Sequence, residues 1–174
     1  MPAYTQIGSA VTVGAGGAAT ISFSSIPSTY TDLVIKLSGR TNRTGDTNAD
    51  IGVTFNGNTS SYSLRDLAGF GTGTSSRTNP IGTANLGDIF ATAANSTSNI
   101  FSNFEIYVPN YAGSANKSVS IDTTNENNAS GNWSLLVAGL WSNSAAITSI
   151  TLTPLNSDSF IEHSTAYLYG VSNA

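Results

Sequence analysis

The chain has 174 residues, the size of one domain, and only 9% of them are charged, against roughly 25% in ordinary soluble domains. The net charge of -4 and the scattering of the six Lys and Arg exclude the basic surface that nucleic-acid binding requires, so we expect no nucleic-acid partner. The absence of cysteine excludes disulfides, thiolate metal sites and cysteine nucleophiles.

No charged and apolar leader follows Met1, and no apolar run reaches the ~18 residues of a membrane helix. We therefore expect a protein made in the cytoplasm, without a signal peptide and without a membrane partner. Ser, Thr, Asn and 17 Gly replace the missing charged residues, and this composition favours strands and turns over long helices.

Apolar and polar residues alternate in many short runs, and each run ends in a cluster of Gly, Asn, Pro or Ser. Two weaker runs predict a short strand at Tyr4–Ile7, within an N-terminal arm of about residues 1–20, and a strand at Tyr62–Leu67. The clearest runs predict strands at Thr20–Phe23, Asp32–Arg40, Asp50–Phe55, Phe101–Val108, Lys117–Asp122, Trp133–Leu140, Ile147–Leu152 and Thr165–Val171.

The run from Trp133 to Trp141 differs from the others because it is apolar on both faces. Leu135 and Val137 would lie on one side of this strand, and Leu136, Ala138 and Leu140 would lie on the other. Strands that are buried on both faces read as continuous apolar runs. We therefore expect this strand to be central in a sheet or to lie at an interface.

The stretch from Ala68 to Asn99 is the least regular part of the chain, and it predicts a long excursion or paired edge elements. Turn signals such as Asn56-Gly57 and Pro109-Asn110 follow predicted strands directly. No repeat is present. The chain is therefore expected to be all-β, with one domain over residues 1–174 that forms a two-sheet antiparallel β-sandwich; a jelly roll is the favoured topology.

His163 is the only histidine, and Asp158, Glu162 and Ser164 lie near it in the sequence. A metal site needs three or four ligands, and a hydrolase needs a geometry that a serine beside a histidine does not supply. The Gly-rich stretch 14–17 lacks the Lys and the helix of a phosphate loop. An ordinary surface or interface histidine is favoured, and we expect no catalytic residue, no metal site, no cofactor and no enzymatic activity.

Carboxylates could in principle form the catalytic pair of a glycosidase, but the sequence does not supply their separation in space. Outward acids that contact only solvent are the favoured interpretation. Oxygen-bearing side chains alternate from Asp122 to Asn128 as in a calcium loop, yet the Gly and the terminal Glu are missing, so a polar turn between strands is favoured. The acids available for a glycosidase pair are Glu105, Asp122, Glu126, Asp158 and Glu162.

Large aromatic side chains are the remaining candidates, because they serve equally in a core, at a subunit contact or as a platform for a sugar. Core packing is favoured over subunit or capsid contacts, and glycan binding comes third. The candidate interface residues are Trp141, Trp133, Tyr107 and Tyr111, while Tyr62, Tyr167 and Tyr169 share their chemistry.

Five segments carry a resemblance to known proteins: Ser25–Val34, Phe104–Ala112, Ala138–Trp141, Ala145–Leu152 and Ser164–Val171. Together they resemble a group of tailed-bacteriophage virion proteins, from about residue 20 onward. No catalytic signature defines this group, so no functional residue is carried over. The resemblance implies a β-sandwich structural protein of the virion that is made in the host bacterial cytoplasm.

Two functions of different classes follow. The first is a capsid decoration or cement protein that binds the major capsid protein or other virion proteins and stabilises the shell as a homo-oligomer, with a trimer favoured. Its N-terminal strand would be free to reach a neighbour, and the strand ending at Trp141 would lie near an interface. The alternative is a tail-fibre or spike domain that binds host-surface glycan. A polysaccharide-cleaving enzyme is the least favoured, because no catalytic set is found.

Overall fold

The computed structural model describes residues 3–127 and 131–172, which form thirteen strands and no helix. Each predicted strand overlaps an observed one. The strands are β1 Ala3–Gln6, β2 Val11–Thr12, β3 Ile21–Phe23, β4 Asp32–Gly39, β5 Asn48–Phe55, β6 Tyr62–Phe70, β7 Gly73–Thr83, β8 Leu86–Thr92, β9 Ser102–Val108, β10 Lys117–Asn125, β11 Trp133–Trp141, β12 Ile150–Pro154 and β13 Thr165–Ser172.

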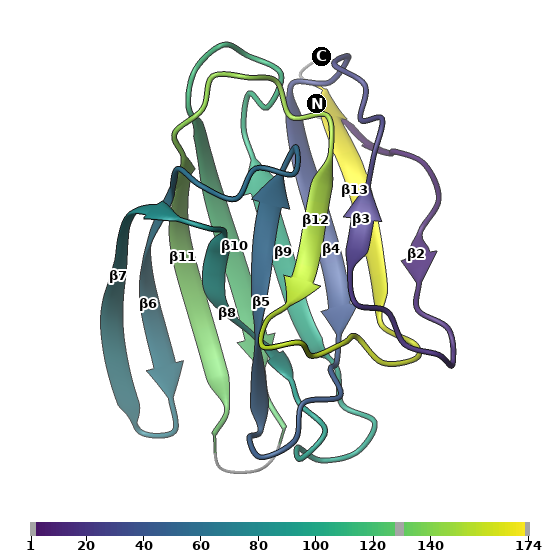
Figure 1. Cartoon of the computed structure of the whole chain (residues 1–174), viewed down its shortest axis with the longest axis vertical. Coiled ribbons are helices and arrows are strands. Elements are labelled where there is room, and N and C mark those ends of the chain that lie inside the picture. The colour runs from purple at the N-terminus through teal and green to yellow at the C-terminus, as the bar shows by residue number, and fades with distance from the viewer. Residues whose placement is uncertain (1–2, 128–130, 173–174) are drawn as a thin grey trace.

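Two antiparallel sheets pack face to face (Figure 1). The larger sheet has the order β1-β13-β4-β9-β10-β11-β6-β7, and β2 also pairs with β13. The smaller sheet has the order β3-β12-β5-β8. The structure confirms the all-β, two-sheet sandwich. The jelly-roll topology stays a prediction, because the consecutive strands β9, β10 and β11 occupy the middle of the larger sheet.

The core lies between the sheets and is built from alternate residues of their strands. Trp141 of β11 is 1% exposed, and its ring centroid lies 5.6 Å from Phe55 of β5 and 6.2 Å from Tyr62 of β6. Burial of each large apolar side chain contributes about 1.5–3 kcal/mol. This aromatic cluster therefore joins the smaller sheet to the larger one.

Strand β11 lies in the interior of the larger sheet, between β10 and β6, as its doubly apolar sequence predicts. The irregular stretch 68–99 contains the end of β6 and two edge strands: β7 ends the larger sheet and β8 ends the smaller. The expectation of paired edge elements is therefore confirmed. The N-terminal strands β1 and β2 pair with β13 of the same chain, so they belong to the larger sheet.

One buried side chain organises the connection between β8 and β9. Arg40 is 5% exposed, and its guanidinium donates hydrogen bonds to the carbonyl oxygens of Ala94, Ser96, Thr97 and Ile100. Burial lowers the pKa of Arg40 from its ordinary value. The Arg40 guanidinium therefore binds four carbonyl oxygens of a loop that lies outside the strands.

Candidate functional site

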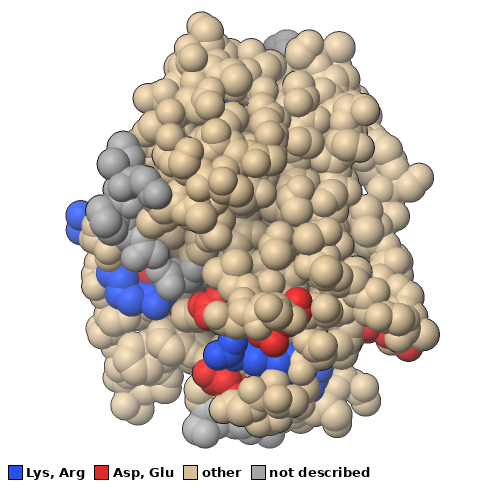
Figure 2. Space-filling view, viewed as in Figure 1, with Lys and Arg blue, Asp and Glu red and all other residues tan. Residues whose placement is uncertain are grey.

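The two outward faces of the sandwich differ in character. Figure 2 views the molecule from the side of the smaller sheet, where charged residues gather toward one end and most of the surface carries none. The exposed strand positions there are short and polar, as in Ser22, which donates a hydrogen bond to Thr151 across the β3–β12 pair. The outer face of the larger sheet carries the longer side chains.

Strand pairing aligns residues of neighbouring strands into rows across this outer face. Leu67 is 56% exposed, Leu136 is 58% exposed and Tyr167 is 36% exposed, so the row through them lies open to solvent. The row changes from aliphatic through charged to aromatic as it crosses the sheet. This central row consists of Ser76, Leu67, Leu136, Asp122, Glu105, Lys36 and Tyr167, in order from β7 to β13.

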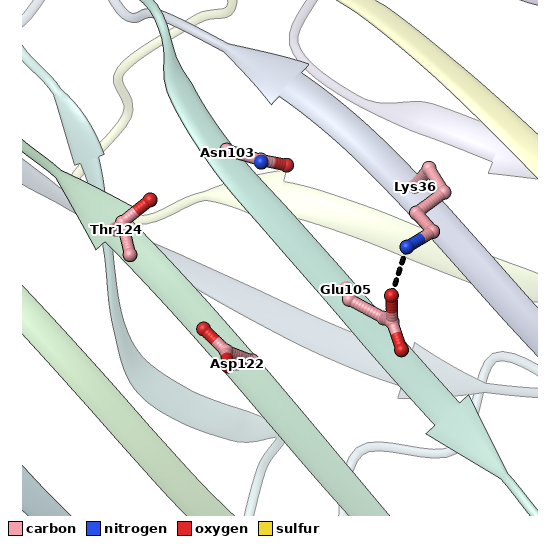
Figure 3. Close-up of a pocket in the computed structure, with 5 residues that line it drawn as sticks. All are labelled: Lys36, Asn103, Glu105, Asp122 and Thr124. Carbon is pink, nitrogen blue, oxygen red and sulfur yellow. Dashed lines mark hydrogen bonds and ion pairs between the residues drawn. The ribbon is translucent and has the colours of Figure 1, made fainter.

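A hollow of about 240 Å³ lies in the middle of this face, over β4, β9 and β10. Its lining side chains are Lys36, Asn103, Glu105, Asp122 and Thr124, and all of them can form hydrogen bonds (Figure 3). The Lys36 ammonium forms an ion pair with Glu105. Asp122 lies directly opposite Glu105 in the register. The hollow therefore offers one paired and one further carboxylate.

Tyrosines gather on one side of the hollow, over β1, β13 and β9; we call Tyr4, Tyr107, Tyr167 and Tyr169 the tyrosine flank. The rings of Tyr167 and Tyr169 are 6.3 Å apart and only 19° from parallel, and Tyr4 meets Tyr169 edge-on at 6.4 Å. Tyr107 donates a 2.8 Å hydrogen bond to Asp32, and this bond raises the pKa of Tyr107. The flank is thus an aromatic surface with its own buried carboxylate.

Aliphatic side chains gather on the other side of the hollow, over β6 and β11; we call Leu67, Leu136 and Ala138 the leucine flank. Leu67 and Leu136 are direct cross-strand neighbours, and Ala138 is the next outward residue of β11. They border an open depression that Arg65 and Ser120 also line. Two leucines that are more than half exposed side by side are the least water-compatible feature of this face.

The aromatic candidates from the sequence occupy different places. Trp141 and Tyr111 lie in the core, so their side chains are not at the surface of the chain. Trp133 is half-buried at one end of the sandwich, where it stacks on Phe70 with centroids 4.6 Å apart. Only Tyr107 lies on the outer face. A partner that meets β11 would therefore contact its outward leucines and not its tryptophans.

The candidate catalytic and metal residues are not brought together. His163 is exposed, Asp158 pairs with Arg43, and the buried Ser164 hydroxyl bonds to the backbone of Arg40. Over residues 3–127 and 131–172 no three His, Asp or Glu side chains cluster as metal ligands would. The acids Glu105 and Asp122 are the exception, because they meet on the outer face.

The supposed calcium loop begins inside a strand. Asp122 to Asn125 belong to β10, and Asn125 and Asn127 are buried. Asn127 donates to Ser96, so these amides join the network that holds the loop before β9. Asn128 lies outside the described residues.

Several members of the outer face were not singled out from the sequence as a site: Tyr4, Lys36, Leu67, Asn103 and Leu136. The doubly apolar pattern around Leu136 was a signal for the leucine flank. The alternation of Tyr167 and Tyr169 was a signal for the tyrosine flank.

No family model, no curated protein and no solved structure matches this chain. In the part of the chain that the structure describes, there is no helix long and apolar enough to cross a membrane.

Proposed function

We propose that this chain is a structural protein of a bacteriophage particle, a capsid decoration protein that binds the shell through the leucine flank. The observation that carries the proposal is the pair Leu67 and Leu136, which are 56% and 58% exposed and directly opposed on neighbouring strands. Burial of the exposed half of each side chain against a partner contributes about 1–1.5 kcal/mol. The resemblance to tailed-bacteriophage virion proteins supplies the class of partner.

The charge distribution supports the same proposal. In the central row Lys36 and Glu105 form an ion pair, so a partner that covers both leaves neither charge isolated. Asp122, directly opposite Leu136, has no such partner among the described residues, so the shell must supply a hydrogen-bond donor to it. A stable contact covers about 800 Å² on each partner. The leucine flank provides its apolar centre, and the surrounding Ser and Thr of the outer face provide a polar rim.

Strand pairing also suits a particle protein with a jelly-roll topology. Strands pair in reverse order on either side of the β6–β7 connection. Strand β6 pairs with β7, β5 with β8, β4 with β9 and β3 with β12. A long hairpin folded into two sheets in the jelly-roll arrangement would give such a pairing, with the β10–β11 hairpin added between β9 and β6, and this supports the proposal. Assembly as a homotrimer multiplies the contacts with the shell, and avidity then strengthens a modest single contact.

The test mixes the purified protein with capsids that lack it and measures co-sedimentation and the temperature at which the particles open. The wild-type protein is expected to sediment with the capsids and to raise that temperature. Leu136→Ser removes an outward side chain, so it should leave the unfolding free energy within about 0.5 kcal/mol of wild type. It should weaken shell binding about tenfold, since 1.4 kcal/mol corresponds to a factor of about ten.

Tyr167→Ala is the matched control, because it removes an exposed side chain at the far end of the same row. It should sediment with capsids as the wild type does. A wild-type protein that stays in the supernatant contradicts the proposal, as does a Leu136→Ser protein that binds with unchanged affinity. Light scattering on the free protein tests the trimer separately.

A further inference from the structure

We propose that the tyrosine flank and the central hollow together bind a neutral oligosaccharide. This goes beyond attachment to a shell, and the site is centred on the tyrosine flank and the hollow rather than on the leucine flank. The site runs across β13, β4, β9 and β10, from the ring of Tyr167 to the carboxylate of Asp122.

The aromatic half of the site is a cluster of tyrosine rings. Tyr167 lies directly opposite Lys36 in the register, on the strand next to the hollow. Tyr169 stacks with Tyr167 at a centroid distance of 6.3 Å, and Tyr4, which is 62% exposed, meets Tyr169 edge-on. Pyranose rings present flat, apolar C–H faces, and large amphipathic rings such as Tyr provide matching surfaces at low entropic cost.

The polar half of the site is the hollow itself. Lys36 and Asn103 supply donors, Glu105 and Asp122 supply acceptors, and Thr124 supplies a hydroxyl that can do both. Sugar hydroxyl groups also donate and accept, so each can bond to a carboxylate and an amide or ammonium at once. Within residues 3–127 and 131–172 Asn103 and Asp122 form no side-chain hydrogen bond, so both remain available to a ligand.

The charge balance of this face favours an uncharged ligand. Its exposed charged side chains on the described strands are Lys36, Arg65, Glu105 and Asp122, two of each sign. With the buried Asp32 carboxylate of the tyrosine flank, the face has a small negative excess and no basic patch across its described strands, so it would not attract a polyanion. The apolar groups of the site are aromatic rings beside hydrogen-bonding side chains. This combination suits a polyhydroxylated sugar ring better than it suits an aliphatic patch on a partner protein.

The dimensions fit a short chain of sugar units. Tyr167 and Asp122 lie on strands that are three spacings apart, about 14 Å. The hollow opens to solvent, so a sugar unit bound in it can remain part of a longer glycan. The site therefore suits an internal stretch of a polysaccharide as well as a free oligosaccharide.

The experiment is affinity electrophoresis of the free protein in native gels that contain dextran, glycogen, galactomannan or xyloglucan, with heparin as an anionic comparison. At least one neutral polysaccharide should retard the protein, and heparin should not. Tyr167→Ala should weaken that retardation at least tenfold and Asp122→Asn severalfold. Leu136→Ser should be retarded as the wild type is, because it lies outside the site. Circular dichroism confirms that each variant is folded.

Three outcomes overturn the inference: no retardation in any of the four neutral gels, retardation by heparin alone, or retardation that survives both Tyr167→Ala and Asp122→Asn. If the protein binds saccharide but not capsids, only the shell-binding proposal fails. If it binds capsids but no saccharide, only the saccharide proposal fails. The two proposals can therefore fail independently.

Discussion

The Arg40 side chain offers the sharpest test of how this fold is held together. Its Nη1 donates to the carbonyl oxygens of Thr97 and Ile100 at 2.7 and 2.9 Å, and its Nη2 donates to those of Ala94 and Ser96 at 3.2 and 3.1 Å. Arg40→Met keeps an unbranched apolar stem of similar length and removes every donor. The substitution therefore isolates the hydrogen bonds from the packing.

The expected loss follows from these four bonds. A hydrogen bond to a charged group contributes about 1.5–3 kcal/mol, which sums to about 6–12 kcal/mol for four. Two effects reduce this sum. The desolvation that lowers the pKa of Arg40 is relieved when the cation is removed. Ala94 and Thr97 are exposed, so their carbonyl oxygens can bond to water. We expect Arg40→Met to lower the unfolding free energy by about 4 kcal/mol.

Urea unfolding with linear extrapolation measures this loss. Arg40→Lys keeps the charge but replaces the planar fork of donors by a compact ammonium, so it should lose about 2 kcal/mol. Arg65→Met is the control, because Arg65 is exposed on the outer face, and it should change the unfolding free energy by less than about 0.5 kcal/mol. An Arg40→Met protein within about 1 kcal/mol of wild type would refute the reasoning.

Three further substitutions test other parts of the structure. Asn56→Ala removes side-chain bonds to Ala146 and Thr148 at a positive φ of 53°, and it should cost about 2 kcal/mol in urea unfolding. Burial raises the pKa of Tyr111. The stability that the neutral Tyr111 hydroxyl contributes is therefore fully present below pH ~10 and is lost as the pH rises through the folded pKa. Tyr111→Phe should make the alkaline loss of stability shallower. Burial lowers the pKa of Lys117, so its effect on stability has the opposite pH dependence. The stability that Lys117 contributes is present above the unfolded pKa and is lost as the pH falls through the folded pKa. Lys117→Met should therefore make the alkaline loss of stability steeper. Urea midpoints between pH 8 and about 11 check both.

Most strands could be predicted from the sequence because each has one buried and one exposed face. In β9, Phe104, Ile106 and Val108 are fully buried and the residues between them are not. The stretch 68–99 lacked this signal for two physical reasons. Strand β7 is an edge strand with little apolar content, and β8 pairs with β5 through a register shift between Ile51 and Val53 that interrupts the alternation.

The candidate site was harder to predict because β11 is apolar on both faces. The sequence alone does not say which set of its residues faces the smaller sheet. The neighbouring strand β10 decides this, because Val119 and Ile121 are buried while Ser120 and Asp122 are exposed. Register with β10 then places Leu136 opposite Asp122, on the outer face. The tryptophans of β11 alternate with the outward leucine and so face the interior.

The two proposed ligands share one face, and this predicts that they compete. A footprint of about 800 Å² has a radius of about 16 Å when centred between Leu67 and Leu136. Asp122 and Glu105 lie on strands about 7 and 12 Å from that centre, whereas Tyr167 lies about 22 Å away. A shell contact on the leucine flank would therefore cover Asp122 and Glu105 of the hollow and leave Tyr167 outside the contact.

A saturating neutral polysaccharide that binds the free protein should therefore reduce its co-sedimentation with capsids, and shell-bound protein should bind that polysaccharide more weakly by the same factor, because coupling between two binding events is reciprocal. Asp122→Asn should weaken the competition, because it weakens saccharide binding but leaves the leucine flank intact. Additive binding of both ligands, with neither affinity changed, would show that the shell contact does not extend from the leucine flank to the hollow.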